Sequence, residues 1–334
     1  MIEWGRCLRA CLGTLGISAA LLLAFLLAVD PYDSGKFGIL GIVGVDDRNT
    51  VTASASRARD PDFDSAILGN STALLLNPVP LSQATGLRFV QLSVVGSSPT
   101  EQLAVLDFFL RHHAHVGALV IGTDPGWCVH GPTEPPRPFP YWLYDTSTLG
   151  YAGRLMSGAA IEHALQRVSI GLGLRPRRDP TGTFNPEDVW PVGQFFAKNG
   201  PADPSPASDA AGRDVFPEIE KLDHVIRSLP ADVPIVLLVP PTFAPTVPQP
   251  GTLQAEEREA CNRALQRLVA GRPHSNFINY RVDNALTRDR ANWLDYIHYR
   301  PLIASKISEG IAASIHLGEA AKIDFQDFRA KASR

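Results

Sequence analysis

Short apolar runs alternate along the middle of the chain with longer segments of helical periodicity. Each run is too short for a helix of normal length and has the apolar continuity of a strand buried on both faces. The runs lie at residues 65–69, 89–93, 118–122, 234–239 and 276–280. The longer segments lie at residues 100–113, 216–229, 253–270 and 302–316. Strands alternating with helices predict a parallel sheet covered on both faces, because right-handed crossovers place helices there.

A different pattern occupies the N-terminus. Residues 12–29 contain no charged side chain. Arg6 and Arg9 precede this stretch, and Asp30 follows it. A segment of this length and composition spans a bilayer, and the preceding positive charges place its N-terminus inside the cell. A cleaved signal peptide is the alternative, but Leu26 before Ala28 makes a poor cleavage site. We therefore expect an uncleaved membrane anchor, with the rest of the chain exported.

The remaining sequence divides by composition. After the anchor comes a segment rich in Gly, Ser, Asp and Arg, without periodicity, which we interpret as a stalk. The α/β pattern follows as one domain, interrupted at residues 126–214 by an aromatic and proline-rich insertion with one helix predicted at 152–170. Residues 199–213 lack large apolar side chains and are expected to be mobile. The predicted organisation is anchor, stalk, α/β domain and tail, at residues 1–30, 31–62, 63–318 and 319–334.

Composition and charge narrow the classes of function. With 45% hydrophobic and 19% charged residues the chain is globular, and its 334 residues fit one α/β domain with a long insertion. The formal net charge of -3 gives no electrostatic footprint for nucleic acid or another polyanion. Of the four cysteines, Cys7 and Cys11 lie on the inner side of the anchor or within it, whereas Cys128 and Cys261 are exported. The exported pair forms either a disulfide or two separate buried thiols.

A candidate nucleophile follows the first predicted strand. Gly-Asn-Ser-Thr-Ala at residues 69–73 combines a glycine that allows a sharp turn with Ser71 at the carboxyl end of the strand. Such a turn presents the hydroxyl and directs backbone N–H groups toward the same point, as the oxyanion in acyl transfer requires. The same pattern also occurs as a simple helix cap, so the serine alone does not define a site.

A candidate acid and base lie near the C-terminus, where Asp295 precedes His298 by three residues. A carboxylate at this spacing can fix the imidazole tautomer and leave the other ring nitrogen free as a general base. A solvated aspartate and a surface histidine near a helix start would show the same spacing. The position just before the last predicted helix, together with the serine after the first strand, favours a Ser-His-Asp arrangement.

These blocks resemble the SGNH (GDSL-like) hydrolases and acyltransferases, whose nucleophile follows the first strand and whose Asp-x-x-His lies near the C-terminus. The resemblance spans residues 64–315. Asp-Pro-Tyr at residues 30–32, residues 67–73 and Asn-Pro at residues 77–78 resemble more closely a bacterial branch of single-pass, membrane-anchored SGNH-like proteins. The resemblance implies a three-layer α/β/α, flavodoxin-like parallel sheet and a Ser-His-Asp mechanism without a cofactor or metal.

The resemblance also implies an oxyanion hole formed by the N–H groups of Ser71 and Gly96 and by the third block of the family. In that block Asp124 occupies the place of the family's asparagine, and a carboxylate cannot donate a hydrogen bond unless it is protonated. Asn70 likewise occupies the place of the aspartate in the usual Gly-Asp-Ser block. These departures favour an alternative function, a catalytically inactive SGNH-fold module that binds a glycan or scaffolds an envelope polysaccharide system.

The predicted anchor and the resemblance together imply a location and a substrate. They predict a single-pass protein of the inner (cytoplasmic) membrane whose catalytic domain lies in the periplasm or outside the cell. The substrate would be an acylated glycan of the envelope or a small ester, and a membrane acyltransferase is the expected partner. Water as acceptor would make the protein an esterase, and a sugar hydroxyl would make it a transferase.

Other signals fit less well. An α/β-hydrolase is disfavoured because residues 69–73 lack the second glycine of its nucleophile elbow. His112, His113 and His115 fall at one helix end without paired carboxylates, which favours a solvated helix terminus over a metal site. Residues 38–44 are rich in glycine but lack the spacing of a dinucleotide-binding loop.

Overall fold

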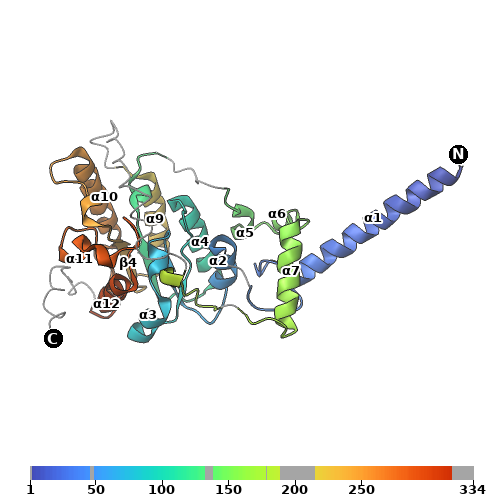
Figure 1. Ribbon diagram of the computed structural model, residues 1–334, viewed down its shortest axis with the longest axis horizontal. Helices are drawn as coiled ribbons and strands as arrows, with labels where there is room; N and C mark the ends of the chain where they lie inside the picture. Colours follow the sequence, from blue (N-terminus) through green and yellow to red (C-terminus); the bar gives the residue numbers. More distant parts are fainter. Residues whose placement is uncertain (1, 46–48, 132–137, 178, 189–214, 318–334) are drawn as a thin grey trace. The chain divides into compact units, whose positions relative to one another are not determined.

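Figure 1 shows a computed structural model of the chain, which describes residues 2–45, 49–131, 138–177, 179–188 and 215–317. Its contacts form two compact units. The N-terminal unit contains Met1–Asp60 and Pro140–Pro180, and the sheet unit contains Pro61–Phe139 and Thr181–Arg334. The segment predicted to be mobile, residues 199–213, and the predicted tail, residues 319–334, lie outside the described residues.

The sheet unit is built on a parallel sheet of five strands in the order β2-β1-β3-β4-β5. The strands are β1 (Ser65–Leu68), β2 (Phe89–Gln91), β3 (Ala118–Gly122), β4 (Ile235–Val239) and β5 (Asn276–Asn279). All five predicted strands and the α/β class with a parallel sheet are therefore confirmed. In doubly wound sheets of this order, ligands bind beyond the carboxyl ends of the strands, where the strand order reverses between β1 and β3.

Helices cover both faces of this sheet (Figure 1). One face carries α3 (Pro78–Thr85) and α12 (Pro301–Leu317), and the other carries α4 (Pro99–His112), α9 (Pro217–Ser228) and α10 (Leu253–Val269). The predicted helices at 100–113, 216–229, 253–270 and 302–316 are confirmed within two residues at each end. Helix α3 was not predicted. Its signals are local: the Asn77 side chain accepts a hydrogen bond from Val79 N, and Gly86 ends the helix in the left-handed conformation.

The core between the sheet and α12 holds the strand ends in place. Ile303, Ile307 and Ile311 recur every four residues along α12 and pack with the buried side chains of Val120 and Val236. Every residue of β3 and β4 is buried, which is why these strands are apolar without alternation. Burial on both faces makes the central strands a rigid support for the loops that follow them.

The predicted anchor corresponds to helix α1 (Ile2–Val29), of which Trp4–Val29 is long and apolar enough to cross a membrane. Most side chains of α1 are exposed, but Leu26 and Val29 are buried near its end. Helix α7 (Gly158–Gly171) packs against α1 within the N-terminal unit. The helix predicted at 152–170 is therefore present but begins later, because Ser157 caps α7 through its side chain.

The prediction of a stalk at residues 31–62 is wrong for most of that segment. It contains helix α2 (Thr50–Ala58) and buries the side chains of Tyr32 and Asp33. Residues 140–180, which the sequence assigned to the insertion at 126–214, belong to the same compact unit. The segment looks like a linker in sequence because its packing depends on polar partners that lie more than a hundred residues away, such as Arg167.

Arg167 is the centre of this polar packing. Its buried guanidinium forms an ion pair with Asp33, with Nη2 2.9 Å from Oδ1. It also donates to the backbone carbonyl oxygens of Val29, Asp30, Ile42 and Gly44. Asp33 accepts further hydrogen bonds from the hydroxyl of Ser56 and the guanidinium of Arg59. The network ties the end of α1 to α2 and α7 and supplies every buried charge in it with partners.

Candidate active site

The turn after β1 places Ser71 at the carboxyl edge of the sheet. Gly69 has a φ of +148°, and a Cβ atom there would lie 2.6 Å from the Cβ of Ala73, so the turn requires glycine. Asn70 Oδ1 accepts hydrogen bonds from Thr72 N at 3.0 Å and from Thr72 Oγ1 at 2.8 Å. The turn is therefore held by its own side chains, and it follows β1 at the point where the strand order reverses.

The structure brings Ser71, Asp295 and His298 together from opposite ends of the sheet unit. His298 Nε2 lies 2.9 Å from Ser71 Oγ, and His298 Nδ1 lies 2.6 Å from Asp295 Oδ2. With a proton on Nδ1, the imidazole donates to Asp295, and Nε2 accepts from the serine hydroxyl. This is the geometry that a nucleophile, a general base and an orienting carboxylate require.

Asp295 is held as an ionised acceptor. Its Oδ1 accepts hydrogen bonds from the backbone N of Ile297 at 2.8 Å and of His298 at 2.7 Å. Burial alone would raise the pKa of Asp295. The hydrogen bond and the electrostatic attraction from His298, together with the two backbone N–H groups, outweigh burial, so the pKa of Asp295 lies below its usual value. The carboxylate is therefore charged at neutral pH and can stabilise an imidazolium.

Tyr299 connects the two halves of the candidate site. Its buried hydroxyl donates, at 2.6 Å, to the backbone carbonyl of Thr72, the residue that follows Ser71. Burial raises the pKa of Tyr299, which keeps the phenol protonated and able to donate. A bridge between Trp293 and Tyr299 closes the loop that carries Asp295 and His298. Tyr299 was not singled out from the sequence, although its position next to His298 was a usable signal.

The predicted oxyanion donors lie on two loops that contact each other. The loop after β2 packs on the serine turn, because Val94 N donates to the carbonyl of Gly69 at 3.0 Å. Gly96, in the same loop, has a φ of +67°, which favours glycine. Among the residues that the structure describes, the backbone N–H groups of Ser71 and Gly96 have no hydrogen-bond partner. Both donors remain available to a ligand.

Asp124, the third predicted member of the oxyanion hole, is placed as an acceptor. Its Oδ1 accepts from Gly126 N at 2.7 Å, and its Oδ2 accepts from Asn70 Nδ2 at 2.8 Å and from Gln102 Nε2 at 3.2 Å. Burial raises the pKa of Asp124, and the hydrogen bonds from Gly126 and Gln102 and the charge of Arg281 oppose that rise. The two positions that depart from the SGNH pattern, 70 and 124, thus contact each other as an amide and a carboxylate.

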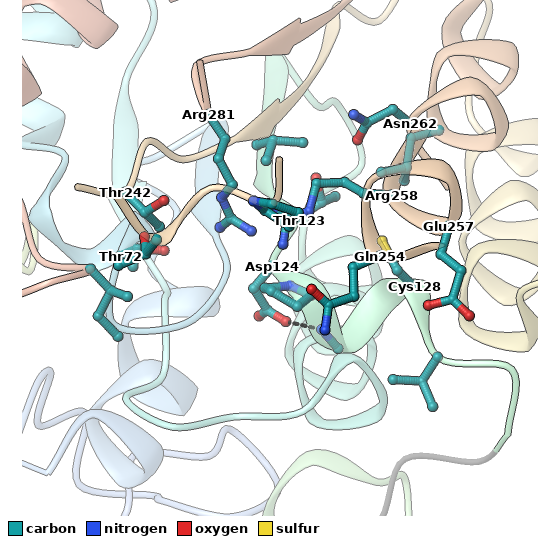
Figure 2. Close-up of a pocket in the computed structure, with 18 of the residues that line it drawn as sticks. Thr72, Thr123, Asp124, Cys128, Thr242, Gln254, Glu257, Arg258, Asn262 and Arg281 are labelled. Atoms are coloured by element: carbon teal, nitrogen blue, oxygen red, sulfur yellow. Dashed lines mark hydrogen bonds between the residues drawn. The ribbon is translucent and has the colours of Figure 1, made fainter. Parts of the chain in front are cut away.

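A cleft of about 780 Å³ opens beside these residues (Figure 2). Asn70 and Thr72, which flank Ser71, line it, and so does Ile297, which precedes His298. Its far wall comes from α10 and from the segment after β5, which contribute Arg258 and Arg281. The cleft has the size of an ordinary small-ligand site and lies beyond the carboxyl ends of the strands.

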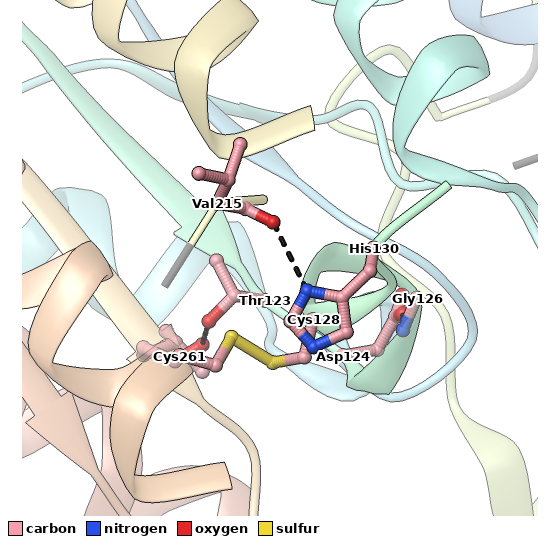
Figure 3. Close-up of a disulfide and its surroundings, with 8 residues drawn as sticks. Thr123, Asp124, Gly126, Cys128, His130, Val215 and Cys261 are labelled. Atoms are coloured by element: carbon pink, nitrogen blue, oxygen red, sulfur yellow. Dashed lines mark hydrogen bonds between the residues drawn. A yellow bond between two sulfur atoms is a disulfide. The ribbon is translucent and has the colours of Figure 1, made fainter. Parts of the chain in front are cut away.

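A disulfide joins Cys128, which lines the cleft, to Cys261 (Figure 3). The sequence left this pairing open, and the structure forms it, with the two Cα atoms 5.4 Å apart. It links η2 (Pro125–Cys128), the short helix that follows Asp124, to α10. The bond therefore restrains the distance between the two walls that hold Asp124 and Arg258.

The histidine cluster at the end of α4 makes contacts that do not converge on one point. His112 lies tilted against the ring of Phe108, with centroids 4.3 Å apart, and His113 stacks on the ring of Phe109, with centroids 4.2 Å apart. Among the described residues, no group of three or more His, Cys, Asp and Glu side chains has the geometry to hold a metal ion.

No family model, curated protein or solved structure matches this chain. The assignment of a function rests on the geometry of the candidate site and on the residues that form it.

Proposed function

We propose that this chain is a membrane-anchored serine esterase or O-acyltransferase that acts outside the cytoplasm. Ser71 is the nucleophile, His298 the general base and Asp295 the carboxylate that orients and stabilises the imidazole. One observation carries the proposal: His298 Nε2 lies 2.9 Å from Ser71 Oγ while its Nδ1 lies 2.6 Å from Asp295 Oδ2. A serine is a weak nucleophile without such a base within hydrogen-bond reach.

The chemistry follows from these positions. Ser71 Oγ attacks an ester carbonyl while His298 Nε2 takes the hydroxyl proton, and Asp295 stabilises the imidazolium that forms. The N–H groups of Ser71 and Gly96 donate to the developing oxyanion. The imidazolium then protonates the departing alcohol, leaving an acyl-serine. Attack by water releases an acid, whereas attack by a sugar hydroxyl transfers the acyl group.

Two features support action on the outer side of the inner membrane. Helix α1 has membrane-spanning length, and its uncharged stretch at residues 12–29 follows Arg6 and Arg9, which favour an N-terminus on the cytoplasmic side. The bond between Cys128 and Cys261 belongs to an oxidising compartment such as the periplasm. In this setting an acylated envelope glycan is the proposed substrate, and a membrane acyltransferase is the proposed partner.

A second candidate function is a non-catalytic module with the same fold that binds a glycan or scaffolds an envelope polysaccharide system. The observation that favours it is the arrangement at Asp124. This carboxylate accepts three hydrogen bonds and does not supply the side-chain donor that the SGNH pattern places there. An oxyanion hole with two backbone donors stabilises the tetrahedral intermediate less than one with three.

A fluorophosphonate probe distinguishes the two functions, because it reacts only with a serine that a nearby base activates. We expect purified full-length protein in detergent to be labelled at Ser71 and Ser71→Ala to lose the label. Ser228→Ala is the matched control, since Ser228 lies exposed at the end of α9 and bonds only its own helix. Folded wild-type protein that stays unlabelled would assign the chain to the non-catalytic module.

A further inference from the structure

Two arginines meet inside the cleft without an anionic partner in contact. Arg281 follows β5 and is only 9% exposed, and Arg258 reaches in from α10 and is half-buried (Figure 2). Among the described residues, neither guanidinium forms a salt bridge or a hydrogen bond. The Nε of Arg281 and the Nη1 of Arg258 are buried with no acceptor.

Both side chains are charged despite their burial. Burial, with a smaller contribution from the charge of Arg258, lowers the pKa of Arg281 to about 10. Burial also lowers the pKa of Arg258 below its usual value. Each guanidinium is still protonated at neutral pH, so the fold holds two adjacent positive charges partly out of water. Such charges are costly unless an anion compensates them.

The carboxylates that line the cleft form no ion pair or hydrogen bond with these guanidinium groups, so the charge of Asp124 compensates Arg281 only from a distance. Asp124 lies close enough to Arg281 to affect its pKa, but its oxygens accept from Gly126, Asn70 and Gln102. Glu257 points away from the two guanidinium groups (Figure 2). The positive groups therefore face open space in the cleft.

A third unsatisfied donor lies on the same cleft. The hydroxyl of Thr242, in the segment after β4, is buried and has no hydrogen-bond partner among the described residues. Three groups with donors to spare thus line one cavity, from α10, from the end of β5 and from the end of β4. Convergent donors from separate elements are typical of a built ligand site.

We propose that Arg258 and Arg281 form an anion subsite that binds a carboxylate or phosphate group of the substrate. The planar fork of a guanidinium matches both of these groups. The link to catalysis rests on the proposed function, because the cleft is lined by Asn70 and Thr72, the two residues that flank Ser71. The substrate class is then an ester that carries a carboxylate or phosphate group, with the anionic group seated in the cleft while the acyl carbonyl meets Ser71.

Net charge does not conflict with this subsite. The formal charge of -3 is a sum over the whole chain and argues only against a broad basic surface for a polyanion. Two buried cations in one cleft recognise a single anionic group locally, where a low effective dielectric strengthens the attraction.

Direct titration tests the subsite without any turnover. Sodium phosphate, sodium galacturonate and glucose would each be titrated into full-length protein in detergent by calorimetry at constant ionic strength. We expect phosphate, galacturonate or both to bind and glucose not to bind. Arg281→Gln should raise the Kd of the bound anion about tenfold or more. Arg281→Lys keeps the charge but loses the fork, and should give an intermediate Kd.

Two further variants keep the test decisive. Arg258→Gln repeats it at a less buried position, in case Arg281→Gln does not fold. Arg263→Gln is the matched control, because Arg263 is exposed on the same helix α10, and its Kd should equal that of wild type. Binding of galacturonate alone points to a carboxylate on the substrate, and binding of phosphate alone points to a phosphate group. No anion binding, or equal weakening by Arg263→Gln and Arg281→Gln, would overturn the subsite.

The failures of the two proposals are separable. If Ser71 takes no fluorophosphonate label but the anion binds and Arg281→Gln weakens it, the esterase is lost and the subsite stands as that of a binding module. If Ser71 is labelled and neither anion binds, the subsite is lost and the serine chemistry stands.

Discussion

In the N-terminal unit the guanidinium of Arg167 is surrounded by acceptors, whereas in the sheet unit the guanidinium of Arg281 is buried without one. Arg167 is 2% exposed and Arg281 is 9% exposed, so the difference does not come from solvent. A buried charge with internal partners holds its own fold together. A buried charge without internal partners can instead be compensated by an anionic ligand.

The same contrast extends to the neighbours of each arginine. Around Arg167, Asp33 accepts from Ser56 and Arg59 as well. At the carboxyl edge of the sheet, the N–H groups of Ser71 and Gly96 and the hydroxyl of Thr242 lack partners among the described residues. At the edge of the sheet these donors are therefore available to a ligand.

The largest expected effect concerns chemistry at the open edge. Asp295→Asn keeps the shape of the side chain but favours the wrong imidazole tautomer, so the turnover of an aryl ester should fall by about 10³ to 10⁴. Ser71→Ala and His298→Ala should each lose at least as much, and the double variant little more, because residues that act as one unit are not additive. Losses that multiply in the double variant would show that the two side chains act separately.

The next effect concerns the closed network. Arg167→Met keeps the stem of the side chain but removes its charge, which leaves Asp33 and several buried carbonyls with fewer donors. We expect the free energy of opening of the N-terminal unit to fall by about 3 to 5 kcal/mol. Amide hydrogen exchange along α7, in full-length protein in detergent, measures it. Exchange in α7 that matches wild type would mean that the network is not stabilising.

The smallest effect comes from the same substitution at the open edge. Arg281→Met removes a buried charge that has no contacting partner. The free energy of opening of β4 and β5 should therefore either rise or fall by less than about 1 kcal/mol. Hydrogen exchange at these strands is the measurement, with Arg167→Met as its counterpart. A loss as large as that expected for Arg167 would show that Arg281 is structural, and the contrast between the two arginines would disappear.

Much of the sheet unit was predictable because its signals are local. The strands are short runs of three to five mostly apolar residues, and α4, α9, α10 and α12 carry helical periodicity, which capping residues reinforce in α4 and α10. Ser71 was predictable from a glycine turn after a strand, and Asp295 with His298 from their spacing. These residues were proposed to form one site, and the structure places them in hydrogen-bond contact.

Other features depend on partners far away in the chain, and for these the sequence predicted wrongly or left alternatives. The stalk prediction failed because Asp33 and Tyr32 are buried through contacts with residues beyond 140, such as Arg167 and Tyr151. The pairing of Cys128 with Cys261 was open because two cysteines 133 residues apart carry no pairing signal.

By itself, the sequence determined the membrane-spanning length of α1 and the parallel α/β class, and it singled out Ser71, Asp295 and His298 as candidates, since each of these signals lies in adjacent residues or in a short period. The tertiary structure alone decided that Asp124 accepts from Asn70 and that Arg167 is satisfied while Arg281 is not. Whether a buried polar group finds a partner depends on which distant segments fold against it, and no local pattern records that.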